Sequence, residues 1–158
     1  MKLKNIIKLL GYFAQGYLLA LGVFYGTGCS SVPIKTERTF YPYMIQFANI
    51  TGVNKTNLKE TKIQFRPREG ATVGTCNWFH NYILVDPLYW FDQATEPERV
   101  ALMWHELAHC VCYAGHKEGH FSDGCPRHIM NPILPGDSCM RKHEETYREE
   151  LRNACAGY

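Results

Sequence analysis

The sequence predicts a small α+β domain, and three of its features support this fold class. Short segments with the alternation of β-strands lie before residue 86, a helical segment without Pro or Gly follows at 98–114, and a charged amphipathic helix follows at 142–154. Strands that precede helices in this way are typical of α+β domains. A chain of 158 residues needs only one hydrophobic core. We therefore expect a mixed sheet packed with these two helices.

The N-terminus has the pattern of an export leader. Three lysines within the first eight residues precede a stretch from Leu9 to Gly28 that carries no charge. Small residues precede Cys29 as in a bacterial lipobox, with Gly26 at the position where Leu is usual. This resemblance implies lipidation of Cys29 and a membrane-anchored lipoprotein of the cell envelope, facing the periplasm or the exterior. An uncleaved anchor and simple secretion are the alternatives, because twenty uncharged residues can just span a bilayer.

Domain organisation follows from this leader. Residues 1–28 are the leader or anchor, residues 29–41 form a polar tether, and residues 42–158 form the folded domain. Local patterns in the domain predict a helix at 43–50 that ends at a Thr-Gly pair, a strand at 62–65, and two strands at 72–79 and 82–85 around a turn at 80–81. An aromatic cluster around this turn and the next segment is interpreted as core; its members are Trp78, Phe79, Tyr82, Tyr89, Trp90 and Phe91.

The long helix is well defined at its start. Thr95 is a suitable N-cap, Glu98 completes a capping box, and Pro97 fits the first turn. At 100° per residue, an apolar stripe that includes Trp104 lies nearly opposite a pair of histidines. Both faces therefore carry residues that favour burial or a ligand, as expected of a helix between a core and a metal cleft.

These histidines belong to the pentapeptide HELAH at 105–109. On a helix, His105 and His109 lie one turn apart with Glu106 beside them, which supplies two zinc ligands and a general base. The alternative to a metal site is a solvated helix face on which these side chains only form hydrogen bonds. Five of the seven histidines lie between residues 105 and 128, and this clustering favours a metal site.

Catalytic zinc usually has three protein ligands and one open position. Gly115 is a natural helix terminator because glycine accepts the left-handed conformation. His116 follows this turn and is the first choice for the third ligand. The spacing leaves three other candidates open: His120, Asp123 and His128.

The segments HELAHCVCYAGH and HIMNP resemble the metzincin zinc peptidases, in particular lipoprotein-like metallopeptidases of bacteria and phages. The resemblance covers residues 95–135. It implies a zincin-like fold in which His105, His109 and His116 bind Zn²⁺, Glu106 is the base and Met130 forms a turn beneath the metal. The chain departs from the usual metzincin spacing, because the third His follows the second by seven residues instead of six and Cys112 replaces a Gly.

The function implied is a membrane-tethered zinc endopeptidase that hydrolyses peptide bonds with a zinc-activated water. Glu106 takes a proton from this water and delivers it to the leaving amine. The first alternative is a non-catalytic, disulfide-stapled lipoprotein that binds metal, and it has no need of Glu106. The second is a zinc hydrolase that acts on a non-protein amide, and export disfavours it.

Six cysteines remain after Cys29, and an even number in an exported domain predicts disulfides. Six cysteines allow fifteen different sets of disulfide pairs. They are Cys76, Cys110, Cys112, Cys125, Cys139 and Cys155. Cys125 and Cys139 are the best pair, since they bracket the expected Met-turn. Cys110 and Cys112 point to different sides of the helix, so we expect different partners for them. Cys112 lies on the histidine face and could instead approach the metal.

The remaining expectations concern partners. The net charge is only +2, without the basic stripe of a nucleic-acid-binding protein. We therefore expect a monomer that acts on a peptide or protein substrate, contacts the membrane through its N-terminus and binds no nucleic acid.

Overall fold

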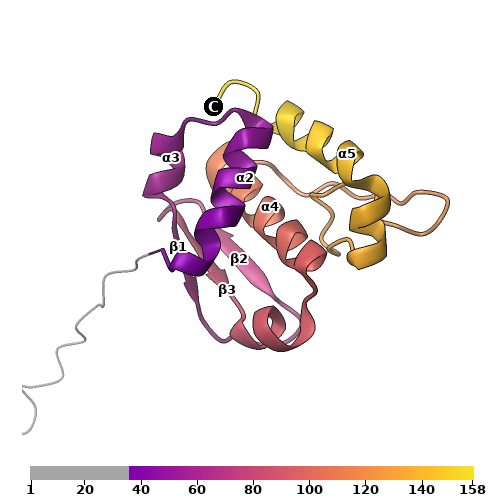
Figure 1. Cartoon of the computed structure of the whole chain (residues 1–158), viewed down its shortest axis with the longest axis horizontal. Helices are drawn as coiled ribbons and strands as arrows, with labels where there is room; N and C mark the ends of the chain where they lie inside the picture. Colours follow the sequence, from indigo (N-terminus) through magenta and orange to yellow (C-terminus); the bar gives the residue numbers. More distant parts are fainter. Residues whose placement is uncertain (1–35) are drawn as a thin grey trace, which may run out of the picture. The chain divides into compact units, whose positions relative to one another are not determined.

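The computed structural model describes residues 36 to 158, so the expected leader, the lipidation site Cys29 and most of the tether lie outside the described residues. The described chain is a mixture of helices and one three-stranded sheet, which agrees with the α+β class (Figure 1). Its elements are η1 (Arg38–Phe40), α2 (Tyr41–Thr51), α3 (Lys55–Glu60), β1 (Lys62–Phe65), β2 (Gly74–Asn77), β3 (Tyr82–Val85), η2 (Tyr89–Gln93), α4 (Glu96–Cys112) and α5 (Asp137–Ala154).

The sheet is mixed, with the strand order β1-β3-β2. β1 pairs with β3 in parallel and β2 pairs with β3 in antiparallel orientation, so β3 is the central strand and is the most buried of the three. The expected strand at 62–65 and the strand at 82–85 are confirmed. The expected strand at 72–79 is shorter, because Trp78 and Phe79 already belong to the turn.

α4 is the central element of the domain, in contact with β2 and β3 on one side and with α2 and α5 on others (Figure 1). The predicted capping box of Thr95 and Glu98 is present. The helix ends at Cys112, because Tyr113 adopts the left-handed conformation with φ 52° and ψ 29°. Our prediction that Gly115 terminates the helix in this conformation was wrong: its φ is not positive.

The two ends of the domain also differ from expectation. Residues 36–41 do not belong to a free tether: the Thr36 hydroxyl donates a hydrogen bond to the Thr61 carbonyl, and Phe40 is fully buried. A main-chain bond from Glu37 to Ile63 adds to this attachment. The C-terminal helix begins at 137, five residues before the expected start, with Gly136 in an extended conformation at its N-cap.

Three disulfides are present among residues 36–158. Cys76 of β2 is bonded to Cys110 of α4, and Cys112 of α4 is bonded to Cys155 at the end of α5. The structure also contains the expected Cys125–Cys139 bond. Cys110 and Cys112 have different partners, as predicted, and the alternative in which Cys112 approaches a metal is wrong because its sulfur is bonded to Cys155.

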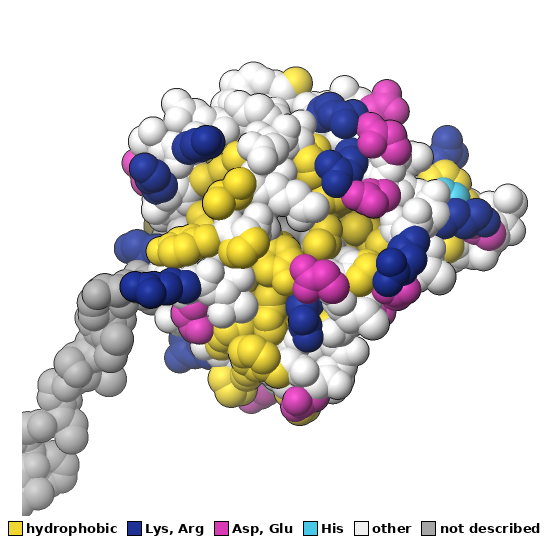
Figure 2. Space-filling view, viewed as in Figure 1, with side chains coloured by type: hydrophobic (Ala, Val, Ile, Leu, Met, Phe, Trp, Pro, Cys, Tyr) yellow, Lys and Arg dark blue, Asp and Glu magenta, His cyan; other side chains and the backbone are white. Residues whose placement is uncertain are grey.

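The face that carries α2 shows a gathering of hydrophobic side chains with Lys and Arg around it (Figure 2). A groove of about 820 Å³ lies here; it is lined by Thr36, Tyr41, Met44, Ile45, Ala48, Lys55, Leu58, Lys59 and Lys62. None of these residues is His, Cys, Asp or Glu, so the groove offers no ligand for a metal. Between residues 36 and 158, no helix has the length and apolar character needed to cross a membrane.

The aromatic residues that we expected in the core divide into two groups. Trp90 is buried and packs against Phe40 and Tyr43. Trp78 and Phe79 are exposed, because the turn between β2 and β3 projects beyond the edge of the core. Phe91 is exposed as well, so the core interpretation is wrong for Trp78, Phe79 and Phe91.

Candidate metal centre

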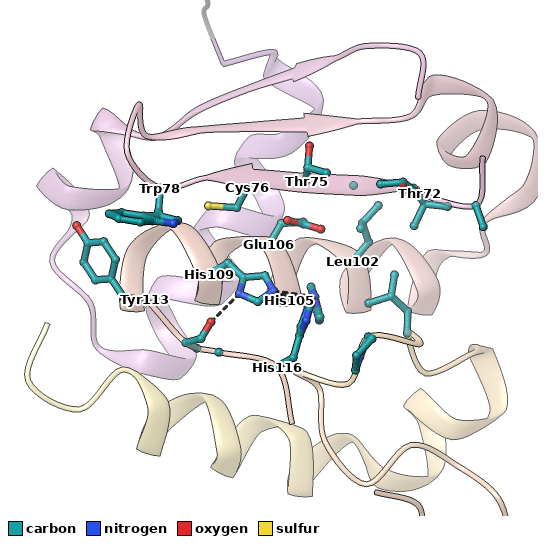
Figure 3. A pocket seen from close by; sticks show the side chains of 17 residues that line it. Thr72, Thr75, Cys76, Trp78, Leu102, His105, Glu106, His109, Tyr113 and His116 are labelled. Carbon is teal, nitrogen blue, oxygen red and sulfur yellow. Dashed lines mark hydrogen bonds between the residues drawn. The ribbon is translucent and has the colours of Figure 1, made fainter. Parts of the chain in front are cut away.

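Three histidine side chains converge in one cleft. His105 and His109 come from successive turns of α4, and His116 comes from the segment after the helix (Figure 3). Their Nε2 atoms are 3.0 Å apart for His105 and His109, 3.1 Å for His109 and His116, and 3.3 Å for His105 and His116. Tetrahedral zinc with Zn–N bonds of about 2.05 Å places its nitrogen ligands about 3.3 Å apart. The triangle therefore has the size of one face of a zinc coordination sphere.

The hydrogen bonds of two histidines determine their tautomers. Nδ1 of His105 donates to the carbonyl of Ile129 over 2.9 Å, and Nδ1 of His109 donates to the carbonyl of Ala114 over 2.6 Å. A carbonyl can only accept, so each neutral ring carries its proton on Nδ1 and leaves Nε2 as a lone pair. These lone pairs point toward one another, and a cation between them relieves their repulsion.

Electrostatics keep the imidazoles neutral. The pKa of His105 is lowered to about 4, mainly by burial; the hydrogen bond to Ile129 opposes this shift, and the neighbouring His109 and His116 add to it. Burial also lowers the pKa of His109, with a smaller contribution of the same sign from His116. Neutral imidazole is the form that binds a metal. At neutral pH, therefore, both rings are available as ligands.

Glu106 faces the same cleft from the adjacent position of α4 (Figure 3). Its side chain is buried, and Oε2 has no hydrogen-bond partner among residues 36–158. Burial raises the pKa of this carboxyl to about 8, although the amide of Cys76 and the charge of Arg68 lower it. A buried carboxylate oxygen without a partner is costly, so Oε2 is suited to a group that enters the cleft from outside.

The segment around Met130 is hydrogen-bonded to the residues that carry the histidine cluster. Met130 is fully buried, and its carbonyl accepts a hydrogen bond from the amide of Lys117, next to His116. The preceding carbonyl, that of Ile129, is the partner of His105. One turn of main chain is therefore bonded both to His105 and to the residue next to His116.

A carboxylate of α5 anchors this turn, and no pattern in the sequence indicates this role. Glu150 Oε2 accepts a hydrogen bond from the amide of Ile129 over 2.8 Å. Its Oε1 lies 3.4 Å from Nζ of Lys117 and 3.2 Å from Nδ1 of His128. Glu150 lies on a charged amphipathic helix where a solvated Glu is usual, so no local pattern distinguishes it.

The other candidates for the third ligand lie elsewhere. His128 contacts Glu150, and His120 is exposed and forms a main-chain bridge with Pro126. Asp123 accepts hydrogen bonds from Lys142 and His143. Of the four, the structure brings only His116 to the pair on α4.

Asp123 and His143 also approach Cys125, which gives a second group of potential metal ligands. The sulfur of Cys125 is bonded to Cys139 and cannot act as a thiolate. The ammonium of Lys142 is paired with Asp123 and occupies the place that a cation would take. This group is a clamp between the loop and α5, and the histidine triangle remains the candidate metal centre.

The cleft has a volume of about 900 Å³ and lies between β2, α4 and the chain after α4 (Figure 3). β2 forms its upper wall, and within the described part of the chain β2 pairs only with β3. The carbonyl of Val73 accepts a bond from Asp86 on the β3 side, whereas the amide of Cys76 faces Glu106. By the alternation of antiparallel pairs, Gly74 and Cys76 direct their main-chain groups away from β3.

We expect Gly74→Ala to destabilise the protein by about 1–3 kcal/mol, the usual effect of overpacking. A Cβ at Gly74 would lie 2.6 Å from Cδ1 of Leu102 and 2.8 Å from Oε1 of Glu106. Both side chains are buried, so neither can move away freely. Urea denaturation of the metal-free protein measures the free energy of unfolding.

Gly115→Ala is the matched control, because a Cβ there meets no atom within 4 Å. It should change the free energy of unfolding by less than about 0.5 kcal/mol. Equal stability of Gly74→Ala and the wild type would show that β2 does not press against Glu106.

Compared with models of known protein families, with curated proteins and with solved structures, the chain has no match. The interpretation of the cleft therefore depends on the chemistry of its own residues.

Proposed function

We propose that this protein is a zinc-dependent endopeptidase with a zincin-like, metzincin-like catalytic domain. The observation that carries the proposal is the triangle of Nε2 lone pairs at 3.0 to 3.3 Å. Glu106 Oε2, which has no hydrogen-bond partner in the described part of the chain, adds a base beside the three donors in the same cleft. Three neutral nitrogen ligands with one open side match the donor set of catalytic zinc.

Zinc held by His105, His109 and His116 would supply Lewis acidity, which would polarise a substrate carbonyl and make water a nucleophile near neutral pH. Glu106 takes the proton of the attacking water on Oε2 and delivers it to the nitrogen of the leaving amine. A nearby cation favours the ionised carboxylate, which offsets the effect of burial on its pKa. Ile129 and Ala114 fix the rings of His105 and His109 through their Nδ1 protons.

The substrate class follows from the wall above the histidines. Gly74 and Cys76 turn main-chain groups toward the cleft, and an extended peptide can pair with such an edge. Paired in this way, its scissile carbonyl lies between β2 and the histidines. An open cleft with an edge strand fits an internal segment of a peptide chain, which favours endopeptidase activity.

The second candidate is a non-catalytic metal-binding protein stapled by disulfides. In such a protein the same three histidines would bind the metal and the three disulfides would stabilise the fold. The position of Glu106 favours the enzyme, because a structural site does not need a buried carboxylate at its open side. A purely structural role for Glu106 would also be expected to satisfy Oε2 within the fold.

Three disulfides fit an oxidising compartment outside the cytoplasm. With the expected leader and Cys29, they support the proposal of a lipoprotein that is tethered to the membrane in the cell envelope and acts there as a monomer.

The test of the proposal is the metal content and activity of the full chain. We expect one zinc per chain after dialysis against EDTA and addition of zinc, together with cleavage of a quenched fluorescent peptide library. Substitution of His105, His109 or His116 by Ala should weaken zinc binding by more than the roughly 10–100-fold that loss of an outer-shell partner costs.

His120→Ala and His128→Ala are the controls and should bind zinc like the wild type. If His116→Ala keeps its zinc while one of these controls loses it, the assignment of the third ligand is wrong. A protein that binds one zinc but cleaves no peptide of the library would support the non-catalytic candidate instead.

A further inference from the structure

Exposed aromatic side chains stand at one end of the cleft. Trp78 and Tyr113 both line it, on the side beyond Cys76, while Leu102 lies toward the opposite end (Figure 3). Their ring centroids are 6.3 Å apart, and Phe79 packs edge-on against Trp78 at 6.2 Å. The exposed fractions are 62% for Trp78, 77% for Phe79 and 60% for Tyr113. We call these three residues the aromatic platform.

The platform is unusual for this chain. The other two tryptophans, Trp90 and Trp104, are at most 2% exposed. Tyr113 occupies the left-handed region of φ and ψ, which is unfavourable for a residue other than glycine. Exposed aromatic clusters of this kind mark binding surfaces, because large rings bury much apolar area when a ligand covers them.

The edge of β2 relates the platform to the metal centre. Glu106 lies beside Gly74 and its carboxylate faces the amide of Cys76, so the reacting bond would lie opposite this part of β2. Trp78 follows Cys76 by two residues and Gly74 by four. At about 3.3 Å per residue, this separation is about 7–13 Å along an extended chain.

We propose that the aromatic platform binds a large apolar side chain of the peptide substrate, two to four residues from the scissile bond. This inference rests on the proposed endopeptidase function and names the specificity of the same cleft. A Phe, Tyr, Trp or Leu side chain placed there packs on the rings of Trp78 and Tyr113, and the contact removes apolar surface of the ligand and of the platform from water.

A peptide fits this surface better than a glycan. The platform continues directly from the edge strand β2, whose outer side can pair with the main chain of an extended peptide. The acceptor and donor side chains that would bind sugar hydroxyls are sparse in the cleft, whose lining between the platform and Leu134 is mostly apolar apart from the metal centre.

The experiment uses Ala-rich decapeptides in which a single Phe is moved along the sequence, with an all-Ala decapeptide as reference. In the zinc-loaded wild type, the peptide with Phe two to four residues from the cleaved bond should have a kcat/KM about 10–100-fold above the all-Ala peptide, the value expected from burial of one aromatic ring. Trp78→Ala should abolish this preference, so that this variant cleaves the Phe peptide and the all-Ala peptide with equal kcat/KM.

Phe91→Ala is the matched control, since Phe91 is exposed but packs on Phe65 away from the cleft. It should keep the preference. Calorimetric titration of the Glu106→Gln protein and of its Trp78→Ala double variant measures the same preference as a binding constant without turnover. This second measurement separates failure of the platform from failure of the peptidase.

If peptides are cleaved and Trp78→Ala keeps the wild-type preference for Phe, the platform proposal is wrong and the proposed function stands. If no peptide is cleaved but the Phe peptide binds in a Trp78-dependent manner, the platform stands and the proposed function fails. Binding of chitooligosaccharides but not peptides at Trp78 would overturn the class of ligand.

Discussion

Glu106→Gln is expected to keep zinc in the site and to lower peptide hydrolysis about 10²–10⁴-fold, the usual contribution of a general base. Gln has nearly the shape of Glu, so the histidine triangle and the packing against Gly74 should persist. The amide group of Gln cannot accept a proton from water at neutral pH. The variant thus removes proton transfer while the three Nε2 donors remain. Measurement of kcat/KM together with the zinc content separates the two effects.

The matched control for this experiment is Glu98→Gln on the same helix. Glu98 belongs to the capping box of α4 and lies outside the cleft, and Gln also serves in such a box. We expect wild-type hydrolysis from it. Wild-type turnover in Glu106→Gln would remove Glu106 from the mechanism, and loss of zinc in this variant would make it a ligand instead of a base.

The sequence predicts the local features of this fold well. The capping box of Thr95 and Glu98 uses only contacts between neighbours in the chain, so it could be recognised without tertiary information. Strands 62–65 and 82–85 could be predicted because alternation and turn residues bound them. His105, Glu106 and His109 could be placed together since helix geometry alone brings positions i and i+4 to one face.

Features that depend on the path of irregular chain were harder to predict. His116 could only be preferred over His120, Asp123 and His128, because the conformation of residues 113–116 decides which ring reaches α4. Tyr113, and not Gly115, makes the left-handed turn. No residue pattern demands a positive φ at a tyrosine, so the sequence favoured the glycine.

The supports of the site were not predictable for a different reason. Ile129 and Ala114 act through their carbonyl groups, which every residue has, so their identity carries no information. Trp78 and Phe79 have the composition of a core, and only the position of the turn beyond the sheet shows that they are exposed. Partners that are far apart in sequence, such as Glu150 and Ile129, become visible only in three dimensions.

Removal of the Cys112–Cys155 disulfide by substitution of both cysteines with Ala should lower the free energy of unfolding by about 4 kcal/mol. The bond closes a loop with a sequence separation of 43, the longest of the three, and loop-closure entropy in the unfolded chain grows with this length. The total free energy of unfolding of a domain of this size is about 5–15 kcal/mol. Urea denaturation in EDTA measures the change without a contribution from bound metal.

This bond also acts on the metal centre. Cys112 is the last residue of α4, and the next residues lead to Ala114, whose carbonyl holds His109, and to His116. Without its link to α5, the helix end frays and the third donor loses its fixed position. We therefore expect zinc affinity to fall in the double variant at a protein concentration and temperature where the domain is still folded.

The Cys125–Cys139 pair provides the comparison. Its sequence separation is only 14, so its removal should cost about 3 kcal/mol. It connects the loop to α5 on the side of the clamp formed by Asp123 and Lys142, and neither cysteine is adjacent to a donor. Zinc affinity should therefore fall less than in the Cys112–Cys155 variant when both are compared at equal folded fraction. Equal affinities in the two variants would show that the end of α4 keeps its position without a covalent link to α5.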